Sequence, residues 1–161
     1  MVIPKTEKSG EAVRVPYNRK SKRSYTHAVG RRREAVARVR LHTAVVMWEG
    51  IEVKPGEIFV NKQPVDIYFK DTVAKQTVAD ILKSTNTTAK YGFTVKVSGG
   101  GKKGQLDALL HGIANAIVTN DEKHRLVLKK KGLLTRDPRT RQRRKVGMGG
   151  KSRRKRQSPK R

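Results

Sequence analysis

The C-terminal segment most strongly limits what the chain can fold into. Residues 129–161 contain 16 of the 39 lysines and arginines but a single acid, Asp137. After Leu134, the only large apolar side chains are Val146 and Met148. Such a segment cannot bury enough apolar surface to offset the entropy lost on ordering, and its charges repel one another. We therefore predict an extended tail and a folded core built from the residues before it.

Charge divides the rest of the chain into two further parts. Residues 1–33 contain ten bases and two acids, whereas residues 34–128 contain 13 bases and ten acids. A near-neutral unit of this length can form one hydrophobic core. We predict a basic flexible arm at 1–25, a globular domain at 26–134 and an extended basic tail at 135–161.

Composition excludes several classes of protein. The chain has no cysteine, so disulfides and thiolate metal sites are excluded. No segment approaches the roughly 20 apolar residues of a membrane span, and the first residues lack the apolar core of a signal peptide. We expect a cytoplasmic protein, with an organelle as the alternative. The formal net charge of +26 favours a phosphate-rich partner. Nucleic acid fits better than a membrane because neither basic arm forms an amphipathic helix with bulky apolar residues.

The first half of the predicted core shows the alternation typical of strands. In segment 34–41, Ala35, Ala37, Val39 and Leu41 share one face, and Arg38 and Arg40 lie on the other, an alternation broken only by Val36. Further strands are predicted at 44–48, 51–53 and 58–60, separated by Glu49-Gly50 and by turn residues at 54–57. We expect these strands to form an antiparallel meander.

The second half changes to the period of a helix. Asp71 is the predicted N-cap of a helix whose apolar face consists of Ala74, Val78, Ile81 and Leu82. A strand at 93–97 and a helix at 106–117 follow. Residues 120–121 are predicted to cap a short third helix that ends near residue 132. The expected fold is an α+β two-layer sandwich of order β-β-β-α-β-α-α, with the helices on one face of the sheet.

A glycine-rich segment, GGGKKGQ at 99–105, lies between the predicted strand and helix. Glycines allow backbone N–H groups to approach an anion, and Lys102 and Lys103 add charge. The segment lacks the Gly-Lys-[Ser/Thr] of a P-loop and does not match GxGxxG followed by an acid ~20 residues later. Contact with an RNA backbone is therefore favoured over nucleotide binding. A purely structural strand-to-helix turn is the alternative.

The sequence shows no recognisable catalytic or metal-binding constellation. The four histidines lack metal-ligand spacing, no serine lies in a GxSxG motif, and the acids form no paired cluster. His111 is interpreted as a structural or RNA-facing residue. Trp48 and the tyrosines are more typical of core or edge positions than of base stacking. We predict a non-enzymatic protein with no cofactor, no metal and no small-molecule substrate.

Five arginines lie within ten residues, before and along the first predicted strand, accompanied by one acid, Glu34. This density exceeds what a solvated strand face needs. We predict that they form a phosphate-binding ridge, and that the body binds RNA through this ridge and through Lys102 and Lys103. The arginines are Arg31, Arg32, Arg33, Arg38 and Arg40.

The tail is the second predicted RNA-binding region. Asp137-Pro138 is expected to turn the chain away from the domain. Beyond this turn, arginines can bridge phosphates and the interspersed glycines allow close approach. A localisation signal or an unspecific polycation is the alternative. The predicted RNA-binding residues here are Arg136, Arg139, Arg141, Arg143, Arg144, Lys145, Lys151, Arg153, Arg154, Lys155 and Arg156.

These motifs, in this order, resemble the universal ribosomal small-subunit protein nine family, in its bacterial type. The matching segments are GRRREAVARVRL at 30–41, VNKQPVDIYF at 60–69, GGGKKGQ at 99–105, HGIANAI at 111–117, GLLTRDPRTRQRRKVG at 132–147 and the terminal Lys160-Arg161. Each motif is weak alone, but their collinear order from residue 30 to the end of the chain is specific.

The resemblance implies a β-β-β-α-β-α fold like the second domain of ribosomal protein five, and a place in the head of the small ribosomal subunit. It also implies binding to small-subunit ribosomal RNA and contact with neighbouring head proteins. It further implies that Lys160 and Arg161 bind the anticodon stem-loop of the P-site tRNA during translation. A phosphate contact does not depend on base sequence, which suits a site that accepts every tRNA.

The chain departs from the family pattern in three places. Segment 42–57 is longer than the usual short turn, which predicts an extended hairpin, and the arm before Tyr25 is also longer. The tail ends in Arg156-Gln157-Ser158-Pro159 before the final pair, where bacterial members have Pro-Gln-Phe-Ser. This change removes an aromatic anchor and alters how the last two residues are placed.

Two other functions are weighed against the ribosomal one. A free RNA-binding or annealing protein outside the ribosome shares the composition but leaves the collinear motifs unexplained. A small-molecule kinase would need an acidic base near the glycine-rich segment. The nearest acid, Asp107, is better explained by the dipole of the predicted helix.

Overall fold

The computed structural model describes residues 24–147. Its main sheet has the strand order β1-β2-β7-β5-β6, and β3 and β4 form a separate two-stranded sheet. The strands are β1 (Tyr25–Arg32), β2 (Ala35–His42), β3 (Val46–Trp48), β4 (Ile51–Val53), β5 (Ile58–Val60), β6 (Gln63–Pro64) and β7 (Gly92–Ser98). The helices are α1 (Val65–Tyr68), α2 (Thr72–Ser84), α3 (Lys102–Asn120) and α4 (Arg125–Lys130), with a 3-10 turn η1 (Glu122–His124) before α4.

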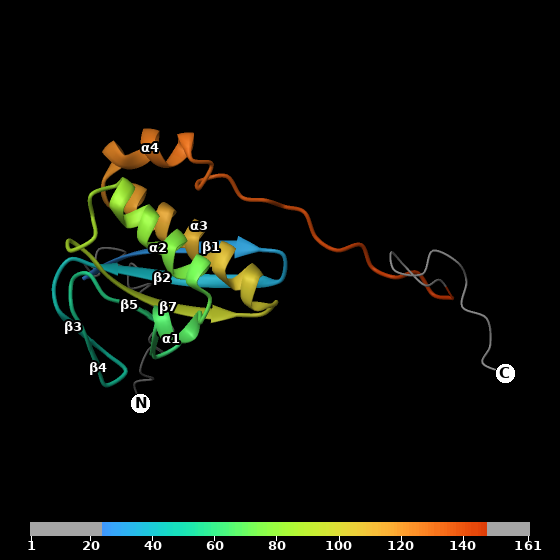
Figure 1. The fold of residues 1–161 in the computed structure, drawn as a ribbon, viewed down its shortest axis with the longest axis horizontal. Helices are drawn as coiled ribbons and strands as arrows, with labels where there is room; N and C mark the ends of the chain where they lie inside the picture. The colour runs from blue at the N-terminus through green and yellow to red at the C-terminus, as the bar shows by residue number, and fades with distance from the viewer. Residues whose placement is uncertain (1–23, 148–161) are drawn as a thin grey trace, which may run out of the picture.

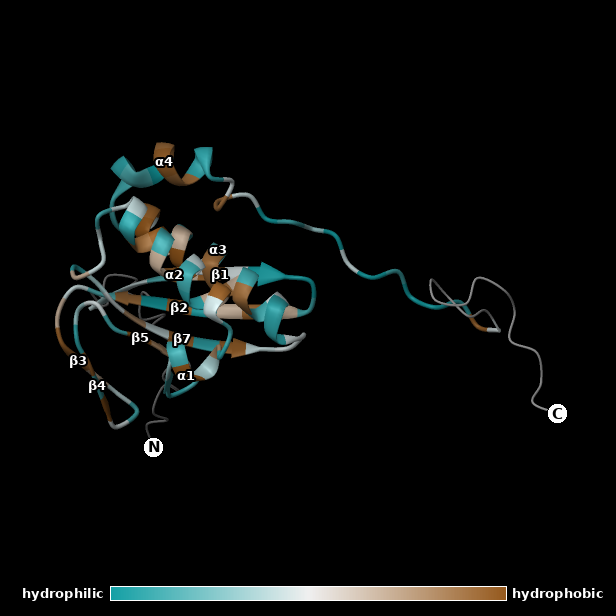
Figure 2. Ribbon diagram, viewed as in Figure 1, coloured by the Kyte–Doolittle hydropathy of each residue, from teal (hydrophilic) through white to brown (hydrophobic). Residues whose placement is uncertain are grey.

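The predicted α+β class is confirmed, with α2 and α3 packed on one face of the sheet (Figure 1). In β2, the alternating residues Ala35, Ala37, Val39 and Leu41 are almost fully buried, whereas the intervening arginines are exposed. The segment after α4 is mostly hydrophilic, in contrast to the mixed helices and strands (Figure 2). None of the helices between residues 24 and 147 is long and apolar enough to cross a membrane.

The strand that begins at Tyr25 was not predicted. Its side chains towards the helices are small or polar rather than large and apolar, because α3 approaches β1 very closely. A Cβ atom on Gly30 would lie 1.9 Å from the carbonyl oxygen of Ala108 and 2.5 Å from the backbone nitrogen of Gly112. The glycine of the GRRR motif and the glycine of the HGIA motif therefore meet where the strand crosses the helix.

The prediction of a simple antiparallel meander is wrong. Strand β5 pairs with β7 in parallel, and the connection between them contains α1 and α2. A parallel pair needs such a crossover, which local sequence patterns do not reveal. The expected hairpin is present as β3 and β4, and its turn at Glu49 and Gly50 has φ angles of 50° and 86°. This geometry suits a tight hairpin turn with Gly at its second position.

The predicted helix after Asp71 is confirmed in its cap and its face. The Asp71 carboxylate accepts a hydrogen bond from the backbone N–H of Val73 at 3.1 Å. All four residues of the predicted apolar face are buried. Helix α3 begins earlier than predicted, at Lys102, so Lys102 and Lys103 belong to its first turn rather than to a loop.

Asp121 is the N-cap residue of η1, within the predicted pair 120–121, but its carboxylate makes no capping hydrogen bond. It accepts hydrogen bonds from the Tyr91 hydroxyl at 3.0 Å and from Lys90 at 3.3 Å. The Tyr91 bond, followed by the Lys90 bond, lowers the pKa of the Asp121 carboxyl. The predicted stop near Gly132 is confirmed by a positive φ of 72° after α4.

Candidate nucleic-acid interface

The face of the sheet opposite α2 and α3 carries a group of exposed basic side chains. We call it the outer face, and it is defined by His27 and Arg31 of β1, Arg38 and Arg40 of β2, and Lys96 of β7. The antiparallel register places Arg40 opposite His27, and Arg38 opposite Lys96. Residues directly opposite each other on neighbouring strands share one face of a sheet, so these side chains are neighbours across three strands.

In the part of the chain that the structure describes, the arginines of the outer face carry charge that no acidic side chain neutralises. Within residues 24–147, none of the ion pairs involves Arg31, Arg38 or Arg40. The guanidinium of Arg40 lies over the ring of Tyr25, 5.0 Å from its centroid. This contact orients the planar group without consuming its hydrogen-bond donors, which suits contact with phosphate oxygens.

The β3–β4 hairpin borders this face and neutralises one of its cations. Glu49, in the hairpin turn, forms ion pairs with Lys96 and Lys62. The hydrogen bond from Lys96, followed by that from Lys62, lowers the pKa of the Glu49 carboxyl. Trp48 is only 6% exposed, and the Lys96 ammonium lies 5.9 Å from its ring centroid. The longer segment at 42–57 therefore packs against the body instead of projecting from it.

His42 is a buried residue at the edge of the outer face. Its Nε2 atom and the Thr94 hydroxyl form a hydrogen bond of 3.0 Å, and its Nδ1 atom has no partner within residues 24–147. Burial, followed by the nearby charge of Arg40, lowers the pKa of the imidazole. The ring is therefore held neutral and acts as a structural group beneath the arginines.

The predicted ridge of five arginines is not one surface. Arg33 lies in the β1–β2 turn with a φ of 53°, and Arg31 lies on the outer face. Arg32 points the other way, towards the start of α3, and its side chain is only 14% exposed. Because side chains alternate between the two faces of a strand, consecutive arginines in β1 could not share a face. The motif was predicted to precede the strand, and a segment outside a strand shows no such alternation.

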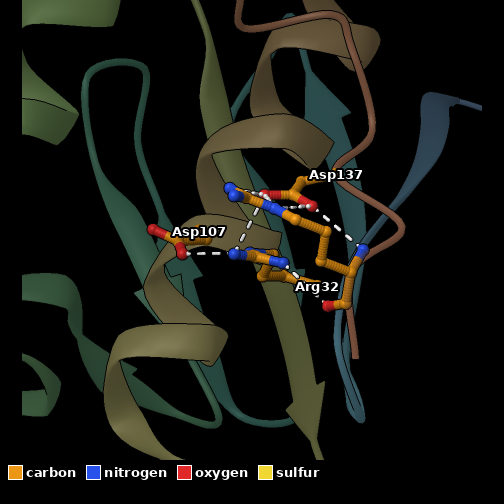
Figure 3. A network of polar contacts seen from close by, with 4 residues as sticks. Arg32, Asp107 and Asp137 are labelled. Atoms are coloured by element: carbon orange, nitrogen blue, oxygen red, sulfur yellow. Dashed lines mark hydrogen bonds and ion pairs between the residues drawn. The ribbon is translucent and has the colours of Figure 1, made fainter. Parts of the chain in front are cut away.

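Arg32 is held by partners from distant parts of the chain (Figure 3). Its Nε atom lies 3.5 Å from a carboxylate oxygen of Asp107, and one terminal nitrogen lies 3.0 Å from a carboxylate oxygen of Asp137. The other terminal nitrogen donates to the carbonyl oxygen of Arg139 at 3.1 Å. Asp107, attributed above to the helix dipole alone, is thus also an ion-pair partner.

The turn at Asp137 and Pro138 does not release the chain as predicted. Asp137 accepts hydrogen bonds from the backbone N–H and the Nε atom of Arg139, each at 3.0 Å. The bonds from the Arg139 side chain, then its backbone, and finally the charge of Arg32 hold the pKa of the Asp137 carboxyl well below its usual range. The chain is therefore still bonded to the body at residue 139.

The glycine-rich segment is fixed by motif residues elsewhere in the chain. The Gln105 side chain donates to the carbonyl oxygen of Gly99 at 3.0 Å and accepts from the Tyr68 hydroxyl at 2.9 Å. Gly99 has a φ of 75°, and a Cβ atom there would lie 2.3 Å from the carbonyl oxygen of Glu34. These contacts support the structural-turn interpretation of its first glycine.

The two lysines of this segment are exposed at the start of α3. The Lys102 ammonium lies 3.6 Å from the centroid of the Tyr68 ring, which holds it above α1 rather than above the outer face. Lys103 has no ion pair within the part of the chain that the structure describes. The lysines therefore add to the positive end of α3, separate from the outer face.

The tail forms a second cationic region. Residues 141–147 are all exposed, and the trace runs away from the body after α4 (Figure 1). Its exposed bases within the described residues are Arg136, Arg139, Arg141, Arg143, Arg144 and Lys145. The remaining predicted residues lie outside the described residues: Lys151, Arg153, Arg154, Lys155, Arg156, Lys160 and Arg161.

Two structural roles were missed by sequence analysis. Lys96 belongs to the outer face, and its alternation with Val95 and Val97 could have revealed it. Asn61 donates from its side chain to the carbonyl oxygen of Val97 and accepts from the Val97 N–H, both at 2.9 Å. It lies 36 residues from Val97, so no local pattern could have indicated this pairing.

Within residues 24–147, no group of three or more His, Cys, Asp or Glu side chains is arranged to hold a metal ion.

Comparison with known proteins places the chain among ribosomal proteins. Residues 30–161 match the family model for ribosomal protein S9/S16. The small ribosomal subunit protein uS9 of Maridesulfovibrio salexigens is 40% identical over 128 residues, which cover 80% of this chain and 91% of that protein. The protein of the same name from Dehalococcoides mccartyi is 38% identical over 127 residues, covering 79% and 89%. The matched region includes the outer face except His27, the glycine-rich segment and the tail, and this chain belongs to the ribosomal protein S9/S16 family.

Proposed function

We propose that this protein is a structural, non-enzymatic component of the small ribosomal subunit that binds small-subunit ribosomal RNA. The observation that carries the proposal is the outer face, where Arg31, Arg38 and Arg40 are exposed and without ion-pair partners within residues 24–147. Family membership supports it independently. Arg32 is left out of the RNA-binding set because its guanidinium is occupied inside the molecule.

The tail adds charge that a folded surface of this size cannot provide. Its arginines can contact phosphates that come from several RNA segments, and neutralisation by RNA removes their mutual repulsion. The RNA-binding set therefore consists of the outer-face arginines, Arg33, Lys102, Lys103 and the bases of the tail. Neighbouring proteins of the subunit are the expected protein partners, and the expected location is the cytoplasmic ribosome, or an organellar one.

The outer face can be tested with matched charge-neutral variants. We expect Arg38→Gln/Arg40→Gln to weaken binding of the full chain to purified small-subunit RNA. Each lost phosphate contact should reduce the slope of log K against log salt by about 0.7–0.9. The control is Lys75→Gln/Lys83→Gln, which removes the same charge from exposed positions on α2. Equal effects of the two double variants would show that net charge, rather than this face, binds RNA.

The end of the tail is proposed to contact the P-site tRNA. Lys160 and Arg161 match the terminal pair of the family, and phosphate contacts would serve any tRNA. We expect deletion of 158–161 to leave subunit assembly intact and to increase the rate at which P-site tRNA dissociates. Unchanged dissociation rates in ribosomes carrying the truncated chain would remove this part of the proposal.

The alternative is a free RNA-binding or annealing protein outside the ribosome. The outer face and the tail would serve it equally well, because phosphate contacts carry no sequence information. What favours the subunit is the match over residues 30–161. Co-sedimentation with small subunits separates the two functions.

A further inference from the structure

Each of the three guanidinium nitrogens of Arg32 contacts an oxygen atom elsewhere in the chain. Asp107 comes from α3, whereas Asp137 and Arg139 come from the segment after α4. The side chain therefore joins β1, the helix packed on it and the first part of the tail (Figure 3). Three separate partners on a planar, rigid group fix its orientation more strongly than a single ion pair would.

The tail side of this contact is itself closed into a turn. The Arg139 guanidinium binds the Asp137 carboxylate through Nε at 3.0 Å and through a terminal nitrogen at 2.6 Å. The backbone N–H of Arg139 binds the same carboxylate. Asp137 is thus bound by one arginine of the body and by one of the tail, and the chain stays bonded to the body as far as residue 139.

The composition of the tail indicates that Asp137 has a structural role. Asp137 is the only carboxylate among residues 129–161. An acid in a segment that only attracts phosphates would reduce its net charge without benefit. The Asp137 carboxylate is instead directed towards two arginines, and it fixes the chain where the tail leaves the body.

We propose that Arg32 and Asp137 form a clasp that sets the direction in which the cationic tail leaves the body before RNA is bound. Arg32 is a positioning residue in this account and touches no RNA itself. The consequence for RNA rests on the proposed function, whereas the clasp itself does not. A tail already directed towards its path loses less conformational freedom on binding, so the clasp raises the binding-competent fraction.

The absence of cysteine from the sequence allows a direct measurement of the tail's position. Gln76→Cys on α2 and Gln142→Cys in the tail are both exposed sites for a pair of spin labels. Pulsed electron paramagnetic resonance then gives the distribution of distances between body and tail. We expect a narrow distribution in the otherwise unchanged chain, and a broad one when Asp137→Asn or Arg32→Lys is added.

The two variants are chosen to separate geometry from charge. Arg32→Lys keeps the charge but offers one ammonium in place of three separately placed nitrogens. Asp137→Asn lies outside every helix and strand, so the domain should fold as before, which circular dichroism checks. Arg31→Gln is the control, because it removes a cation one residue away on the outer face. It should leave the distance distribution unchanged.

RNA affinity gives an independent readout. Asp137→Asn removes one negative charge, so the change in net charge alone predicts tighter binding to purified small-subunit RNA. The clasp predicts weaker binding, by about tenfold if the competent fraction falls to roughly one tenth.

The outcomes separate the clasp from the proposed function. Unchanged distance distributions in both Asp137→Asn and Arg32→Lys would overturn the clasp, whatever the RNA affinity. Broad distributions together with tighter RNA binding by Asp137→Asn would overturn the proposal that the clasp directs the tail for RNA binding. Failure of the parent chain to bind this RNA would count against the proposed function, and the distances would still decide the clasp.

Discussion

Gly30→Ala should destabilise the domain through the contact between β1 and α3. The new Cβ atom would lie 1.9 Å from the carbonyl oxygen of Ala108 and 2.5 Å from the nitrogen of Gly112. Both are backbone atoms of a buried helix, so no side chain can rotate away. Comfortable contact needs about 3.5 Å, so strand and helix must separate by more than ~1 Å along their contact.

The expected loss is about 3 kcal/mol, at the upper end of the range for overpacked cores. For a domain of this size, this corresponds to a fall in Tm of about 12 °C. Urea unfolding followed by the fluorescence of Trp48, the only tryptophan and 6% exposed, measures the change. Circular dichroism shows whether the whole domain unfolds in the same transition.

Gly104→Ala is the matched control, because it makes the same substitution in the first turn of α3. Its Cβ atom would lie 3.7 Å from the Cβ of Ala35, an ordinary contact. Alanine is favoured over glycine within a helix, so this variant should gain about 0.5–1 kcal/mol. A loss below 1 kcal/mol for Gly30→Ala, or equal losses for both variants, would refute the packing argument.

Three further predictions concern the core and its titrating groups. Ile117→Ala, at a fully buried position, should cost about 2–5 kcal/mol in unfolding free energy, whereas Val73→Ala at an exposed position should change it by under about 0.5 kcal/mol. The lowered pKa of His42 means that the folded state disfavours protonation of this side chain. Its contribution to the free energy of unfolding is therefore complete above pH 6.5 and declines as the pH falls below that value. The difference in the free energy of unfolding between pH 7.5 and pH 5.5 should be smaller in His42→Gln than in the parent chain, and an equal difference would contradict this. Tyr91→Phe removes the main hydrogen bond that lowers the pKa of Asp121. It should destabilise the protein at pH 7, and the difference from the parent should shrink as the pH falls below 3.8; a constant difference would argue against the bond.

Local patterns in the sequence predicted those parts of the fold that depend on neighbouring residues. The alternation in β2 and the 3.6-residue period in α2 both reflect one buried face, and Asp71 bonds within its own turn. The Glu49-Gly50 hairpin turn belongs to the same class. Each of these features is determined within about a dozen residues, so each leaves a readable pattern.

The missed features depend on residues far apart in the chain. Strand β1 lacks an apolar stripe because α3, some 80 residues later, lies too close for large side chains at Gly30. The parallel pairing of β5 with β7 is set by the crossover through α2. Arg32 could not be separated from Arg31 without knowing that both lie in a strand and that Asp107 and Asp137 meet on one side of it.

The candidate interface was predicted in composition but not in arrangement. Arg38 and Arg40 were placed on the correct side of their strand, because the alternation of β2 determines it. Lys96 joins them only through the register of β2 with β7. Which of these cations meets RNA stays a prediction.

Sedimentation of a cell lysate through a salt-washed density gradient tests the central claim most directly. A structural component of the small subunit should co-migrate with it in stoichiometric amounts and remain bound at moderate salt. Recovery of the protein in the light fractions, or its release from subunits at moderate salt, would contradict the claim and favour a free RNA-binding protein.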